Sequence, residues 1–343
     1  EMKTYRVALA GHGAAARTIH IPALRKIPEV RILGTYDTRE DTGAIPRFAT
    51  LEQLLDAKPD IVVIATPPDS HADIAVNALT SGAHVFCEKP LANSLDEADV
   101  IAAAAAQANR KVCINSEFPF MPMHLAAARE VGSARFGKLL FVEARQTFVV
   151  TDATEAGWRG QDPQRTFKEF GTHAIDLCKA LFNEQPVSLS ARMPRPFHSE
   201  GPDYLDLVRL EFSDDRVAQI TLDRLTKGSH RYLDMRLVGE RATIETSLGG
   251  SAEFSFGLRP QGRRPYADLD LHLGGVARLC TGDRKITLAK APLDVFPDAT
   301  ARLFRAFLQA IEEDREPPNG IADARNTLEL IYRAYSEAAP RRV

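Results

Sequence analysis

The sequence is poor in cysteine, has a single tryptophan and contains no long apolar run. Its four cysteines stand far apart, with no CxxC pair and no Cys/His cluster at zinc-ligand spacing. We therefore expect no disulfide framework and no metal, and the thiols are typical of a cytoplasmic protein. No apolar stretch reaches the roughly 18 residues of a membrane span, and the first residues pass directly into a strand without a signal-peptide core. Neither a membrane protein nor a secreted one is expected.

The net charge is also small. The chain has 43 Lys and Arg against 46 Asp and Glu, a formal net charge of −3, so no overall field favours nucleic acid or an anionic membrane. Hydrophobic residues make up 44% and charged residues 26% of the sequence, which is ordinary for a globular protein with a substantial core. At roughly 150 residues per domain, 343 residues predict two domains. The expected partner is a small molecule.

The first third of the chain alternates apolar strands with helices. Strands are predicted over 7–10, 30–36, 60–65, 84–87 and 112–115, and helices over 17–27, 51–57, 70–81 and 94–107. Strands that are apolar along their whole length, joined by helical crossovers, are typical of a parallel sheet covered on both faces. The pattern predicts an α/β fold class, with a doubly wound Rossmann domain over residues 1–120.

Beyond about residue 120 the pattern changes to a period of two. Strands are expected over 139–144, 205–212, 218–222, 232–238 and 242–246, and helices over 167–182, 299–314 and 322–338. Alternation of apolar and polar residues indicates antiparallel strands with one wetter face. Residues 121–343 are therefore predicted to form an α+β domain on an open, mainly antiparallel sheet. The Pro- and Arg-rich stretch at 259–265 is expected to be a surface loop.

The first strand is followed by G-x-G-x-x-A at residues 11–16, a dinucleotide-binding pattern. Its first glycine permits a tight turn, its second lets a pyrophosphate approach the backbone, and its alanine allows the helix to pack closely on the strand. A strand-to-helix turn with two glycines is also common for structural reasons, but here it opens a βαβ unit, where the helix N-terminus attracts phosphate. The cofactor contacts expected from this turn are Gly11, His12, Gly13, Ala14 and Ala15.

An acidic residue stands where this motif requires one. Asp37 ends the second strand, about 20 residues after Ala16, which is the spacing of the acid that binds the adenosine ribose. Its carboxylate would accept hydrogen bonds from the ribose hydroxyls and repel a 2′-phosphate, so NAD is favoured over NADP. Arg39 keeps NADP possible because a guanidinium can pair with a 2′-phosphate, although a solvated loop arginine is the alternative. Thr38, between the two, is assigned to the same site.

Four further motifs follow in order. They are ATPPDSH at 65–71, EKP at 88–90, GWR at 157–159 and GTHAIDL at 171–177. Together with the glycine turn they resemble the Gfo/Idh/MocA oxidoreductases, the family of glucose-fructose oxidoreductase and inositol dehydrogenase. The resemblance implies hydride transfer between NAD(P) and a hydroxyl carbon of a sugar, cyclitol or related polyol. It also implies a second domain that binds substrate and forms a homodimer or homotetramer, with C-terminal helices that can pack on the first domain.

The resemblance assigns the chemistry to two residues. Lys89, at the carboxyl end of a parallel strand, would hydrogen-bond the reacting oxygen and stabilise its developing charge. His173 would accept the hydroxyl proton, since an unperturbed pKa near 6.5 suits proton transfer around neutral pH. Glu169 lies one helical turn before His173 and could orient the imidazole. A surface lysine and a structural histidine are the alternatives.

The remaining cofactor contacts also follow from the resemblance. They come from the loop after the third strand, the EKP segment, the end of the last parallel strand and a segment of the second domain. They are Ala65, Thr66, Pro67, His71, Glu88, Lys89, Asn115, Trp158 and Arg159. For Trp158 a buried core role is the alternative.

Two departures from the family pattern leave the substrate open. In the family, a glycine-rich stretch and an aspartate commonly precede the histidine. This chain has Gln-Arg-Thr-Phe-Lys-Glu-Phe at 164–170 instead, with Glu169 in place of the aspartate. The usual arginine-phenylalanine pair after Asn115 is replaced by Ser-Glu-Phe-Pro at 116–119.

Three functions stay open. They are a dehydrogenase or reductase, a non-catalytic nucleotide-binding sensor or regulator, and an enzyme that keeps NAD bound and uses transient oxidation for elimination or glycosidic cleavage.

Overall fold

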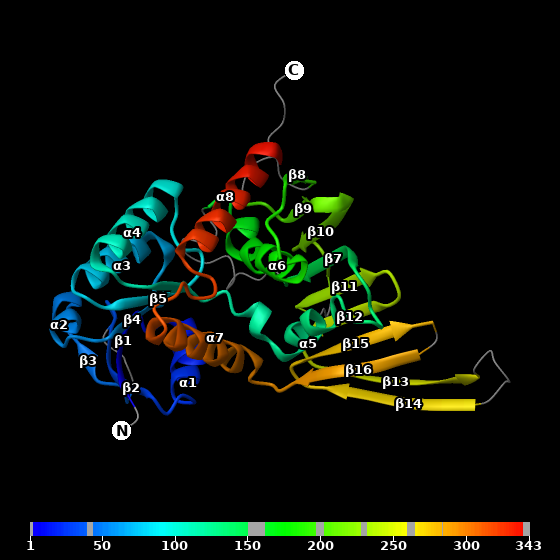
Figure 1. The fold of residues 1–343 in the computed structure, drawn as a ribbon, viewed down its shortest axis with the longest axis horizontal. Helices are drawn as coiled ribbons and strands as arrows, with labels where there is room; N and C mark the ends of the chain where they lie inside the picture. Colours follow the sequence, from blue (N-terminus) through cyan, green and yellow to red (C-terminus); the bar gives the residue numbers. More distant parts are fainter. Residues whose placement is uncertain are drawn as a thin grey trace, which may run out of the picture. The chain divides into compact units, whose positions relative to one another are not determined.

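Two large sheets and a separate two-stranded ribbon organise the chain (Figure 1). The computed structural model describes residues 3–39, 44–149, 162–196, 202–227, 232–258, 265–282 and 284–338. Within these ranges, none of the helices combines the length and the apolar composition that crossing a membrane demands.

The first sheet is parallel throughout and confirms the predicted Rossmann architecture. Its strand order is β3-β2-β1-β4-β5-β6, so the chain winds outward from β1 in both directions, as in a doubly wound sheet. The sheet also contains a short edge strand, β3, that the sequence pattern did not predict. The strands are β1 (Tyr5–Ala10), β2 (Val30–Tyr36), β3 (Arg47–Phe48), β4 (Ile61–Ile64), β5 (His84–Cys87) and β6 (Val112–Ile114).

Helices cover both faces of this sheet. The first helix departs from the predicted regular helix, because it contains one wide π-helical turn, η1. Two further short turns, η2 and η3, are 3₁₀ helices. The segments are η1 (Ala16–His20), α1 (Ile21–Leu24), α2 (Leu51–Asp56), η2 (Pro68–Ser70), α3 (His71–Thr80), α4 (Leu95–Ala108) and η3 (Phe118–Phe120).

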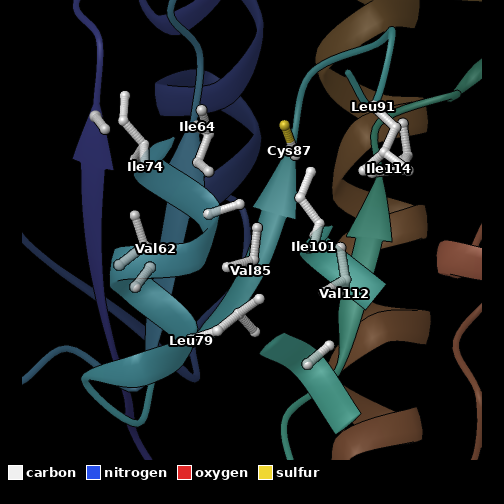
Figure 2. Packing of buried hydrophobic residues seen from close by; sticks show 14 of the residues in the cluster. Val62, Ile64, Ile74, Leu79, Val85, Cys87, Leu91, Ile101, Val112 and Ile114 are labelled. Carbon is white, nitrogen blue, oxygen red and sulfur yellow. The ribbon is translucent and has the colours of Figure 1, made fainter. Parts of the chain in front are cut away.

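Each central strand buries both of its faces. Figure 2 shows Val62 and Ile64 of β4 on the face that carries α3, packed with Ile74 and Leu79. Ile61 and Val63, the alternate residues of β4, join a second cluster on the opposite face. That cluster includes Phe304 and neighbouring residues of the helix at 295–312. Because neither face of β4 is left to water, this strand is apolar at every position.

The chain divides into two compact units, which are described separately. The first unit contains Glu1–Phe120, Phe167–Asp176 and Phe296–Arg333, and the second contains Met121–Thr166, Leu177–Val295 and Ala334–Val343. The first unit thus includes the N-terminal part of α6 (Thr166–Phe182) from Phe167 on and most of α7 (Val295–Glu312) and α8 (Ile321–Ala338).

The second unit is built on an eight-stranded mixed sheet of order β16-β15-β12-β11-β7-β10-β9-β8. Its neighbouring strands are antiparallel except for β7 and β10, which are parallel. Helix α6 lies in the chain between these two strands, as parallel strands need a long crossover connection. The predicted strands are present, whereas β8, β15, β16 and helix α5 were not predicted. The elements are α5 (Pro122–Glu130), β7 (Leu139–Thr147), β8 (Ser188–Arg192), β9 (Leu205–Phe212), η5 (Ser213–Asp215), β10 (Arg216–Asp223), β11 (Leu233–Gly239), β12 (Thr243–Leu248), β15 (Gly275–Thr281) and β16 (Arg284–Ala291).

A two-stranded ribbon is formed by β13 (Ser251–Leu258) and β14 (Pro265–His272), drawn in yellow beside β16 in Figure 1, and does not join the ladder of the eight-stranded sheet. The loop predicted over 259–265 falls almost entirely outside the described residues. Phe254 pairs with Leu269 in the antiparallel register, and their side chains are 65% and 67% exposed. The ribbon therefore presents an apolar face to solvent.

Candidate active site

The glycine turn after β1 requires its first glycine and leaves space at its second. Gly11 has a φ of +101°, and a Cβ there would lie 2.5 Å from the carbonyl oxygen of Ala65, so only glycine fits. A Cβ on Gly13 would meet, among the described atoms, only the Arg39 guanidinium at 3.6 Å. Ala16 is fully buried against the sheet. The backbone at Gly13 is thus open to a ligand, as the dinucleotide motif demands.

Asp37 lies at the end of β2 beside this turn. Its carboxylate accepts a hydrogen bond from the main-chain N–H of His12 at 2.6 Å and bonds from the main chain and guanidinium of Arg39 at 2.8 and 3.1 Å. Burial acts to raise the pKa of Asp37, but the donors on Arg39 and His12 outweigh it and lower that pKa to about 2. Asp37 is therefore ionised at neutral pH, while the Arg39 side chain is 62% exposed.

The other residues assigned to this part of the site differ in accessibility. Ala14, in the glycine turn, and Thr38, after β2, are exposed, whereas Ala15 is half-buried. His12 is 5% exposed and contributes its main-chain N–H. The accessible groups therefore come from both the glycine turn and the end of β2.

The loop after β4 is tied to the EKP segment by His71. This side chain is 0% exposed, with Nδ1 2.9 Å from the Pro90 carbonyl oxygen and Nε2 3.0 Å from that of Thr66. Burial lowers the pKa of His71. The imidazole thus connects the loop after β4 with the EKP segment. Both of its nitrogens contact main-chain carbonyls, so its predicted role as a cofactor contact stays a prediction. Thr66 is half-buried, and its hydroxyl accepts a hydrogen bond from Ser70 at 2.8 Å.

Glu88, just after β5, lies inside a chain of hydrogen bonds. His20 Nε2 is 2.7 Å from its Oε1, and Asn115 Nδ2 donates to the same oxygen at 2.8 Å. Burial acts to raise the pKa of Glu88, but His20, Lys89 and Asn115 outweigh it and lower that pKa to about 2. Glu88 is therefore a carboxylate. Asn115, assigned to the cofactor from the resemblance, is 0% exposed and holds Glu88 in place.

Lys89 connects the end of β5 with helix α6. Its Nζ donates a hydrogen bond to the main-chain carbonyl of Glu169 at 2.7 Å and lies 5.4 Å from the centre of the Phe170 ring. The carbonyl and the aromatic face both attract a cation. The ammonium group is therefore fixed at the carboxyl edge of the parallel sheet, where such folds bind ligands.

His173 lies one turn further along α6, 4% exposed. Its ring stacks on that of Phe118, with centroids 3.8 Å apart and 10° between the planes. Burial, and then the positive charge of Lys89, lower the pKa of His173 well below its usual value, although Glu88 opposes them. The imidazole is therefore neutral at neutral pH and able to accept a proton. Lys89 and His173 were predicted from motifs about 80 residues apart. In the fold they are close enough for the charge of Lys89 to lower the pKa of His173.

Glu169 takes part in this cluster through its backbone. Its carbonyl accepts the bond from Lys89, whereas Nδ1 of His173 is buried and has no hydrogen-bond partner in the described part of the chain. The stack with Phe118, and not a bond from the Glu169 carboxylate, holds the imidazole in this structure. The orienting role of that carboxylate stays a prediction. Trp158 and Arg159 lie outside the described residues.

Sequence reasoning left out three residues of the cluster. His20 is separated from its partner Glu88 by 68 residues, and no local pattern connects the two. Phe118 and Glu117 lie in the segment that departs from the family pattern, so that departure was the one available signal. Its first residue, Ser116, also faces inward, because its hydroxyl donates to the Asp176 carboxylate at 2.5 Å.

The residues expected to hold NAD fit that group in two respects. The backbone at Gly13 is open, and Asp37 is an ionised acceptor whose Arg39 partner is exposed enough to move. A metal site has no comparable support, because no three or more His, Cys, Asp or Glu side chains gather in a metal-binding arrangement within the described ranges.

Two family profiles match the chain. The profile described as "Oxidoreductase family, NAD-binding Rossmann fold" matches residues 5–116, and the "GFO/IDH/MocA C-terminal domain" matches residues 124–245. Together they cover more than half of the sequence, and each falls on one side of the boundary predicted near residue 120.

Named relatives and solved structures are also similar to the chain. Levoglucosan dehydrogenase of Pseudarthrobacter phenanthrenivorans is 26% identical over 215 residues, covering 54% of this chain and 55% of that protein. Inositol 2-dehydrogenase 2 of Saccharopolyspora erythraea is 26% identical over 193 residues, covering 55% of each. These matches span about half the length of the relatives. An oxidoreductase from Agrobacterium radiobacter, crystallised with NAD⁺, L-tartaric acid and magnesium, has the same fold, with a TM-score of 0.80, 17% identity and coverage of 99% of this chain and 98% of that one.

Proposed function

We propose that this chain, which belongs to the Gfo/Idh/MocA family of oxidoreductases, is an NAD-preferring dehydrogenase or reductase of a sugar, cyclitol or related polyol. The observation that carries the proposal is the pairing of a fixed lysine with a neutral histidine at the carboxyl edge of the Rossmann sheet. The names of the two dehydrogenase relatives support the substrate class.

Oxidation of a secondary alcohol needs a donor that holds the oxygen and a base that takes its proton. Lys89 would donate a hydrogen bond to the substrate oxygen and stabilise its developing negative charge. His173 would take the hydroxyl proton at Nε2, because Nδ1 is enclosed. The Glu169 carbonyl and the Phe118 ring hold these two groups in position. When bound, the nicotinamide supplies the hydride acceptor or donor.

The preference for NAD rests on Asp37. Its ionised carboxylate would accept hydrogen bonds from the ribose hydroxyls and repel a 2′-phosphate. NADP use would require the exposed Arg39 guanidinium to leave its bond with Asp37 and pair with that phosphate. Because that step exposes the Asp37 charge to a second anion, NAD is the cofactor we propose.

We infer that the chain acts as a homodimer or homotetramer, with the β13–β14 ribbon in the interface. A two-stranded ribbon is marginally stable alone, and this one exposes Phe256 at 77% and Leu271 at 54% besides the Phe254–Leu269 pair. An apolar face of this kind marks an interaction surface. Sedimentation should show a smaller species for Phe256→Asp than for wild type, and an unchanged species would exclude the ribbon from the interface.

The activity is tested by incubating the purified protein with NAD⁺ or NADP⁺ and a panel of sugars, cyclitols and other polyols. We expect cofactor reduction together with a product that has lost two hydrogens, measured by mass spectrometry. Cofactor binding with no product from any compound would favour the sensor or regulator. An eliminated or cleaved product without net cofactor reduction would favour transient oxidation.

A further inference from the structure

Glu117 is a buried acid in the segment that connects β6 with η3. It is 4% exposed, and its neighbours are fixed on both sides: Ser116 is bonded to Asp176, and Phe118 is stacked on His173. The main-chain carbonyl of Glu117 accepts a hydrogen bond from the N–H of Phe120 at 2.9 Å. The backbone at Glu117 is therefore fixed between two residues that contact α6, and its side chain is buried.

The surroundings of Glu117 favour its neutral form. Among the described residues, no Lys, Arg or His nitrogen lies within 4.0 Å of its carboxyl oxygens to form an ion pair. A buried carboxyl group without a counter-ion ordinarily keeps its proton. The charged groups that act on it are Glu88 and Lys89, both on the segment after β5, and Glu88 is already ionised through His20 and Asn115.

The electrostatic balance supports this assignment. Burial and the negative charge of Glu88 raise the pKa of Glu117 to about 8, although its own main-chain N–H and Lys89 act in the opposite direction. Of the two neighbouring carboxyl groups, one is therefore charged and the other protonated at neutral pH, as expected when like charges share a low-dielectric site.

We propose that Glu117 sets the alkaline limit of the hydride-transfer site: as a neutral acid it adds no negative charge beside Lys89, and its ionisation slows the reaction. The inference rests on the proposed function. The reacting oxygen gains negative charge as its proton leaves, and Lys89 stabilises that charge. A second carboxylate beside Lys89 would offset the ammonium charge and so weaken this stabilisation.

The pH profile of kcat for alcohol oxidation tests the proposal. In wild type, kcat should fall above a pH of about 8 as Glu117 ionises, approaching a loss of about tenfold per pH unit. Glu117→Gln keeps the shape of the side chain and stays neutral. Its kcat, expressed relative to its own value at neutral pH, should therefore lose this alkaline fall. Glu130→Gln, in which the replaced residue lies on α5 and bonds Arg135, is the matched control and should keep the wild-type profile. An unchanged alkaline fall in Glu117→Gln would overturn the proposal.

A second readout does not depend on turnover. Asp206 is a second buried acid whose pKa is raised by burial, so the infrared spectrum of cofactor-free Glu117→Gln is subtracted from that of wild type. The difference should contain the C=O band of a protonated carboxyl group, lost as the pH rises past about 8. If the band is present but no polyol is oxidised, the proposed function fails while the protonation of Glu117 stands. If the difference has no such band at neutral pH, the proposal fails even when the enzyme is active. Should Glu117→Gln not fold, Glu117→Met provides a second neutral variant.

Discussion

The Phe118 ring lies flat on the imidazole of His173, with the ring centroids 3.8 Å apart. Stacking fixes the plane of the imidazole without donating or accepting a proton. It also shields one face of the ring from water, which contributes to the lowered pKa of His173. The proposed base is thus held by an apolar neighbour from the segment after β6.

Replacing Phe118 by leucine should impair catalysis more than substrate binding. The change keeps the site apolar but removes the flat partner, whose stack contributes about 0.5–1.5 kcal/mol beyond buried area. We expect kcat to fall about tenfold with KM nearly unchanged, measured by steady-state kinetics. Phe212→Leu is the matched control because Phe212 stacks on Phe182 at 4.0 Å in the second unit. An equal fall of kcat in both variants would point to general loss of stability instead.

Replacing Asp37 by asparagine should relax the choice of cofactor. The variant keeps an oxygen for the His12 N–H but removes the charge that repels a 2′-phosphate. We expect kcat/KM for NAD to fall about 10–100-fold, since hydrogen bonds to charged groups contribute about 1.5–3 kcal/mol. The corresponding value for NADP should hold or rise, because Arg39 is released from its bond. A ratio of the two values identical to that of wild type would contradict the role of Asp37.

The buried acid Glu117 should make folding stability depend on pH. Its pKa is about 8 in the folded protein and 4.5 as the ordinary value, so the folded state binds more protons than the unfolded state between these limits. Stability from this group is present below pH 4.5 and is lost as the pH rises toward 8, at about 1.4 kcal/mol per pH unit. Urea unfolding of wild type and Glu117→Gln across this range measures the effect. Wild type should weaken relative to the variant as the pH rises, and a constant difference would show that Glu117 is ionised throughout.

Local patterns predicted the Rossmann half of the fold closely. The strand over 30–36 and the strand over 84–87 have the predicted bounds, because apolar runs that end at turns or charged residues have few alternative structures. In the second unit, β16 carries charged residues and little apolar alternation, so its strand structure depends on pairing with β15. The parallel pairing of β7 with β10 is likewise set by residues distant in sequence.

The site shows the same division between local and distant information. Gly11, Asp37 and Lys89 stand in recognisable motifs, and the structure places them at the carboxyl ends of parallel strands. Helical spacing correctly put Glu169 on the same stretch of helix as His173, but periodicity cannot tell that its carbonyl, rather than its carboxylate, bonds Lys89. The neutral state of Glu117 depends on burial and on the charge of Glu88, which only the folded chain reveals.

The central claim is that Lys89 and His173 carry the chemistry of hydride transfer. The most direct measurement is the single-turnover rate of transfer from a deuterium-labelled polyol to bound NAD⁺, in wild type, Lys89→Met, His173→Asn and the control Lys138→Met. Lys138 is a half-exposed lysine paired with Asp214 in the second unit. We predict that both site variants bind NAD⁺ but transfer deuterium about 10²–10⁴-fold more slowly, while Lys138→Met matches wild type. Transfer at near the wild-type rate in both site variants would contradict the account.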